Sequence, residues 1–240
     1  MRKSNNYLGV CMIALLIGVF SLFFSSCLSM GLGGKKGGSG GKSVNMNDVK
    51  SEDRGIRILV AKATASFLKG SAKVFSAVGK KEEAMKYQQA AEELENNPED
   101  PQKIKESLLV ADEANKSLEE IKTENARVSA EGKKELGRGI VHVGAGGMLD
   151  IAAAGKAADF LETLKNALGV VQANPAKYGM GAVDTLKGSL DLMTFLSSEL
   201  PKQGAAISDT FSGLIKYAST NGVTVTKADA EKEAAKMEKG

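Results

Sequence analysis

Along most of the chain after Asn47, apolar residues recur at intervals of three and four positions. That spacing places them on one face of an α-helix. The pattern is interrupted at glycine and proline, residues that end helices. The first half of the chain therefore predicts helices over 47–79, 84–96 and 104–128. Asp100-Pro101 is typical of a helix start, because aspartate caps free backbone N–H groups and proline fits the first turn.

Residues 136–172 keep the helical spacing but contain seven glycines. Each glycine inside a helix costs about 1 kcal/mol relative to alanine. The favoured explanation is a break near GAGG, residues 144–147, that makes a hairpin or a kink. Close backbone approach between helices is the second explanation, and a membrane-inserting hairpin is the third. Asp150 and Lys156 argue against a membrane-spanning segment, because buried charges are costly in a bilayer.

Two further helices are expected to start at prolines, one after Asn174-Pro175 and one at Pro201. Residues 219–229 predict a turn followed by a brief extended segment, and the charged residues after them predict a helix or a frayed tail. No alternating run supports a sheet. The expected fold class is all-α, either a multi-helix bundle or stacked antiparallel helical hairpins.

The first 27 residues follow a different pattern. Arg2 and Lys3 precede a long apolar run, 8–24, which ends at the small residues Ser25-Ser26. This is the order of a secretory signal, although the run is nearly long enough for an uncleaved transmembrane anchor. The segment FSSC, residues 24–27, resembles the lipobox of bacterial lipoproteins, with phenylalanine where an aliphatic residue is usual.

The lipoprotein resemblance implies that Cys27 is acylated, becomes the new N-terminus and attaches the chain to a membrane. Leu28 follows it, and the sorting rule that comes with the resemblance then favours the outer membrane within the cell envelope. The glycine- and lysine-rich stretch that follows is expected to be a flexible tether. Its GKS sequence lacks the glycine spacing of a phosphate-binding loop.

These features predict four parts. They are a lipoprotein signal peptide over 1–26, the lipidated cysteine with its tether over 27–46, an α-helical domain over 47–222 with a candidate sub-boundary near 132–147, and a charged C-terminal tail or helix over 223–240.

Composition excludes several function classes. The formal net charge is +3, and loss of Arg2 and Lys3 with the signal leaves about +1, so no basic field is available for nucleic acid. The two cysteines, Cys11 and Cys27, leave no disulfide for the mature domain. His142 is the only histidine, so neither a two-histidine metal site nor a catalytic relay is supported. We expect no enzyme activity, cofactor or metal.

Residues 77–100 resemble the second helix of a tetratricopeptide repeat, with Gly79, Ala84, Tyr87 and Ala91 near the small and aromatic positions of that family. The family stacks helix pairs into a concave peptide-binding surface. The match covers one repeat only, and an ordinary amphipathic hairpin explains the same residues.

Two main functions remain open. In the first, the helical domain of an envelope lipoprotein is a scaffold that binds another envelope protein; a tetratricopeptide-like adaptor is a variant of it. In the second, helices of 136–200 bind a lipid or another apolar ligand, or contact a membrane. The second function assigns a groove or cavity to Met148, Ile151, Phe160, Met180, Met193 and Phe195.

Overall fold

The computed structural model describes residues 43–122 and 128–239. Cys27 and the rest of the signal and tether up to residue 42 lie outside the described residues. The helices are α2 (Met46–Ala77), α3 (Lys81–Asn96), α4 (Pro101–Ile121), α5 (Ala130–Ala173), α6 (Pro175–Tyr178), α7 (Met180–Thr220) and α8 (Lys227–Lys239). The described residues contain no strand, so the predicted all-α class is confirmed.

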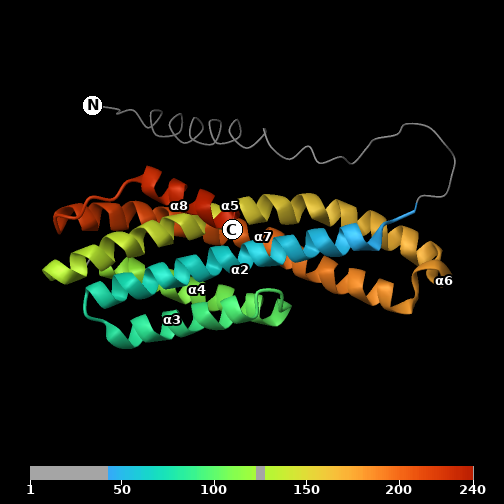
Figure 1. Ribbon diagram of the computed structural model, residues 1–240, viewed down its shortest axis with the longest axis horizontal. Coiled ribbons are helices and arrows are strands. Elements are labelled where there is room, and N and C mark those ends of the chain that lie inside the picture. Colours follow the sequence, from blue (N-terminus) through green and yellow to red (C-terminus); the bar gives the residue numbers. More distant parts are fainter. Residues whose placement is uncertain (1–42, 123–127, 240) are drawn as a thin grey trace, which may run out of the picture. The chain divides into compact units, whose positions relative to one another are not determined.

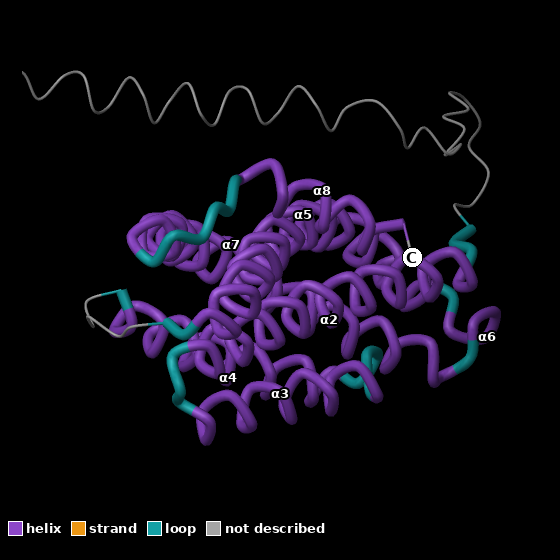
Figure 2. Tube along the Cα trace, turned by 60° about the vertical axis from the view of Figure 1, so that its left-hand side comes forward, coloured by secondary structure: helices purple, strands orange, loops and turns teal. Residues whose placement is uncertain are grey.

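Helices α2 and α5 lie side by side in the middle of the bundle (Figures 1 and 2). Helices α3 and α4 pack on α2, whereas α7 and α8 pack on α5. One hydrophobic core runs through all of these helices except α6, and its largest buried side chains include Phe67, Phe75, Tyr87 and Phe160. Residues 42–240 form one compact unit with this core inside it, as expected of a segment that folds by itself.

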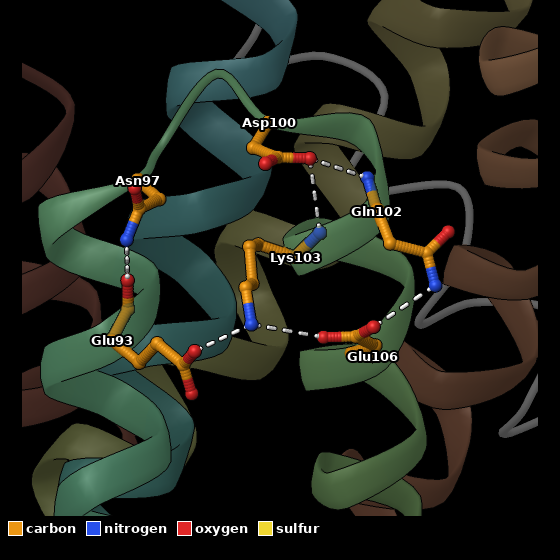
Figure 3. A network of polar contacts seen from close by, with 6 residues as sticks. All are labelled: Glu93, Asn97, Asp100, Gln102, Lys103 and Glu106. Atoms are coloured by element: carbon orange, nitrogen blue, oxygen red, sulfur yellow. Dashed lines mark hydrogen bonds and ion pairs between the residues drawn. The ribbon is translucent and has the colours of Figure 1, made fainter.

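The turns between the first three described helices follow the sequence signals. Gly79, at φ +85°, ends α2 in a conformation that other residues rarely adopt. Figure 3 shows the turn from α3 to α4, where Asp100 accepts hydrogen bonds from the backbone N–H groups of Gln102 (2.8 Å) and Lys103 (3.3 Å). The Lys103 ammonium group links the two helices, because it contacts Glu93 on α3 at 2.5 Å and Glu106 on α4 at 3.3 Å.

Substitution Asp100→Ala is expected to lower the free energy of unfolding by about 1 kcal/mol, because it removes the side-chain cap of α4. The matched control is Asp112→Ala on the same helix, which removes only an exposed ion pair with Lys116 and should change stability by less than about 0.5 kcal/mol. Urea denaturation of residues 43–240 measures both. Equal losses in the two variants would show that the cap contributes nothing specific.

The predicted break at GAGG is wrong, because α5 continues through it as one helix of 44 residues. The glycines are contact points instead. A Cβ on Gly146 would lie 2.8 Å from the backbone of α2, and one on Gly144 would lie 2.6 Å from the ring of Phe211 on α7. Close helix approach, the second explanation from the sequence, accounts for these glycines.

The predicted helix start at Pro201 is also wrong, because Pro201 lies inside α7. Proline removes one backbone hydrogen bond from a helix interior and normally kinks or ends it. Here the apolar stripe continues on both sides of the proline, with Leu196, Leu200 and Ile207 all buried in the core. Tertiary packing therefore keeps the helix continuous.

Candidate functional site

Two depressions lie next to each other on the surface formed by α2 and its neighbours. The first, here the Met85 groove, has a volume of about 320 Å³ between α2 and α3 and is lined mainly by Ala72, Ser76, Ala84, Met85, Gln88 and Gln89. The second, here the basic cleft, has a volume of about 700 Å³ between α5, α8 and the segment before α8, and its charged or titratable lining residues are Lys73, Arg138, His142, Asp229, Lys232, Glu233 and Lys236. Lys73 lines both depressions.

Small residues on two helices create the Met85 groove. Ala72 on α2 and Ala84 on α3 leave space where larger side chains would fill the seam between the helices. Met85 stands beside this space with 62% of its surface exposed, so its apolar side chain is accessible to a partner. A flexible thioether side chain of this kind adapts to the shape of a partner.

Cations outnumber carboxylates in the basic cleft. Lys73 and Arg138 share Glu135 at the edge of the cleft, at 3.7 and 3.3 Å, while Lys236 pairs with Glu233 at 3.0 Å. Lys232 forms no ion pair within 4 Å among the described residues, but its charge helps to lower the pKa of the neighbouring Asp229 carboxyl. The cleft is therefore suited to an anionic group.

The Asp229 carboxylate is only partly available to neutralise the cations of the cleft, because it caps the start of α8. Its carboxylate accepts hydrogen bonds from the backbone N–H of Thr226 at 2.9 Å and from the hydroxyl of Thr226 at 2.6 Å. These hydrogen bonds lower the pKa of Asp229 below its ordinary value, so the residue remains an ionised cap.

His142 lies at the inner wall of the basic cleft. Burial lowers the pKa of its imidazole, nearby Lys73 and Lys69 lower it further, and Glu233 opposes the shift. His142 is thus uncharged at neutral pH. The hydroxyl of Ser66 lies 3.5 Å from Nδ1 of His142 but donates its hydrogen bond to the backbone oxygen of His142 at 3.1 Å. Because Ser66 is also buried, this pair does not have the geometry of a nucleophile and its base.

The residues that the sequence assigned to an apolar groove lie elsewhere. Phe160 and Met193 are buried in the core, Met148 and Phe195 pack against it, and Ile151 is 43% exposed, with its side chain against Gly204 of α7. The side chain of Met180 is outside the described part of the chain. None of the five described residues lines the Met85 groove or the basic cleft.

Sequence reasoning did not find the two depressions, because their walls come from segments far apart in the chain. Lys73, Arg138 and Lys232 lie on three different helices, and nothing in their local sequence indicates that they converge. The one local signal was Met85, an apolar residue on a face of α3 that is otherwise polar.

Asp150 is a second chemically notable residue, outside both depressions. Its side chain is fully buried in α5, and neither carboxylate oxygen has a hydrogen-bond partner among the described residues. Burial raises the pKa of this carboxyl well above its ordinary value. Asp150 lines neither depression, so we expect its ionisation to change the free energy of unfolding of the bundle.

Comparisons of the chain with models of protein families, with curated proteins and with solved structures find no match. The function must therefore be inferred from the residues of this chain. Within the described residues, no helix has the length and apolar character needed to cross a membrane.

Proposed function

We propose that this protein is a lipid-anchored lipoprotein of the bacterial cell envelope, and that its helical domain is a non-enzymatic scaffold that binds another envelope protein. The observation that carries the scaffold part is the pair of neighbouring depressions that share Lys73. The lipid anchor rests on the lipobox resemblance at residues 24–27, and the outer membrane is its favoured location. Acylated Cys27 is the proposed membrane contact.

The position of the surface favours a protein partner. Helix α2 starts at Met46, the last residue of the proposed tether, and Lys73 follows 27 residues later in the same helix. At 1.5 Å per residue, Lys73 is about 40 Å from the start of α2. The binding surface is therefore well separated from the residue at which the proposed tether joins the bundle, which leaves room there for a protein partner.

Packing gives the apolar-ligand alternative less support. That alternative needs the apolar side chains of residues 136–200 to surround a ligand, but Phe160 and Met193 are fully buried by contacts within the bundle. The Met85 groove, by contrast, offers an exposed apolar side chain to a partner surface.

The lipid anchor is tested by metabolic labelling. The full chain, expressed in a bacterium with an alkyne-bearing fatty acid, is expected to incorporate the label and to fractionate with membranes. Cys27→Ser is expected to lose the label, because it removes the thiol that is acylated. Cys11→Ser is the matched control and should remain labelled. Labelling that survives Cys27→Ser would contradict the proposed anchor.

Protein binding is tested by site-specific photo-crosslinking in intact cells. A photoreactive residue at Gln88, in the Met85 groove, is expected to give a discrete adduct with one envelope protein, identified by mass spectrometry. Leu109, which is 71% exposed on α4 and lines neither depression, is the control position. Adducts of equal yield at both positions, or none at Gln88, would contradict the scaffold function.

A further inference from the structure

The Met85 groove and the basic cleft form one continuous surface at their shared edge. Lys73 lines both, and Glu135 at the edge of the groove pairs with Lys73 and with Arg138 of the cleft. A segment bound in the groove therefore lies next to Lys73, which also lines the basic cleft.

The two parts of this surface require different chemistry. The groove has a floor of small residues and one exposed methionine, which suits an apolar side chain. In the cleft, Lys232 forms no ion pair within 4 Å among the described residues, although its charge acts on the Asp229 carboxylate. Lys73 lies 3.7 Å from its ion-pair partner Glu135. These cations remain available for carboxylates of a partner, because weak exposed ion pairs are easily exchanged.

We propose that this surface binds an acidic amphipathic segment of the partner protein, with an apolar side chain in the Met85 groove and carboxylates in the basic cleft. This inference rests on the proposed scaffold function and specifies the chemistry of its partner. It requires no change in the bundle, because both depressions are present in the unbound chain.

A protein segment fits this surface better than an anionic lipid surface does. A flat array of headgroups offers charge to the cleft but no apolar side chain to the neighbouring groove. Lys73 joins the two depressions, so a ligand uses both of them only if it carries an apolar side chain and carboxylates on one face.

The test uses residues 43–240 and two synthetic amphipathic helices, each about 18 residues long with a leucine face. The polar face of the first helix is glutamate, and that of its twin is lysine. Binding is measured by fluorescence anisotropy at low and at physiological ionic strength. The acidic helix is expected to bind, and its affinity should fall as salt screens the carboxylates. The basic twin should bind at least about tenfold more weakly.

Three variants locate the binding site. Lys232→Glu should weaken the acidic helix about tenfold, because an attraction becomes a repulsion, and Met85→Ser should weaken it by a similar factor through lost apolar contact. Lys50→Glu is the matched control, because Lys50 is also exposed but lies about 35 Å from Lys73 along α2. It should change the affinity less than about twofold. Circular dichroism checks that all variants fold.

Several results would overturn this inference. The first is equal binding of the acidic and basic helices, and the second is equal weakening by Lys50→Glu and Lys232→Glu. The third is binding of phosphatidylglycerol vesicles that depends on Lys232, combined with no binding of the acidic helix. Failure of the scaffold function is detected separately, as the absence of a groove adduct in cells. An adduct at Gln88 combined with no binding of the acidic helix would retain the scaffold and reject the acidic partner.

Discussion

Substitution Gly139→Ala is expected to lower the free energy of unfolding by about 2 to 3 kcal/mol, because the added methyl group has no space. A Cβ at Gly139 on α5 would lie 2.7 Å from the backbone oxygen of Gly70 on α2. A Cβ at Gly70 would in turn lie 2.7 Å from the backbone oxygen of Gly139. The nearest atom that the new methyl group meets belongs to the backbone of α2, which cannot move aside as a side chain can.

The matched control is Gly155→Ala in the same helix. A Cβ at Gly155 meets nothing within 4 Å, and the residue is exposed. Alanine there should stabilise the protein by about 1 kcal/mol through helix propensity alone. Urea denaturation of residues 43–240 measures both variants. If Gly139→Ala is as stable as Gly155→Ala, then α2 and α5 are not in backbone contact at this level.

The helices of the first half of the chain could be predicted because their signals are local. The apolar spacing of α2, the left-handed glycine after it, and the Asp100 cap of α4 each act within a few residues. Helix class and the starting points of these helices follow from such signals, but the predicted end of the third helix at residue 128 is wrong, because α4 ends at Ile121 and Val128 lies outside it. The lipidation of Cys27 and the single-repeat resemblance at residues 77–100 stay predictions.

The errors at 144–147 and at Pro201 have one physical cause. Glycine and proline weaken a helix by a local free-energy cost that the sequence displays, whereas the contacts that offset this cost come from distant residues. Gly146 is compensated by close packing on Phe67 of α2, some 80 residues away. The two depressions could not be predicted from the sequence for the same reason. Lys73, Arg138 and Lys232 are brought together only by the packing of α2, α5 and α8.

The contribution of Asp150 to stability should fall as the pH rises, and Asp150→Asn should remove this contribution. Burial is the sole cause that raises the pKa of Asp150, and no charged side chain contributes to the shift. The folded protein therefore binds this proton more tightly than the unfolded chain does. The resulting stabilisation is fully present below the ordinary pKa of an aspartate, and it is lost as the pH rises toward the raised pKa of the folded state.

Asparagine occupies nearly the same volume as aspartate but does not ionise, so it isolates the titration from the packing. At pH 8, Asp150→Asn is expected to be more stable than the unsubstituted protein by at least about 1 kcal/mol, because each unit by which burial raises the pKa of the carboxyl represents about that much free energy. Near pH 4 the two proteins should differ little, because the carboxyl is then protonated in the folded state. Urea denaturation across this pH range supplies the free energies of unfolding.

Asp191→Asn on α7 is the control for this pH series, because Asp191 is exposed and its replacement should not change the slope. Other carboxylates titrate over the same range, so the decisive quantity is the difference between each variant and the unsubstituted protein at each pH. A difference for Asp150→Asn that stays constant from pH 4 to pH 8 would mean that Asp150 is hydrated or paired in solution. A difference that grows with pH would establish a buried, unpaired carboxyl in the middle of the helix on which α2, α7 and α8 pack.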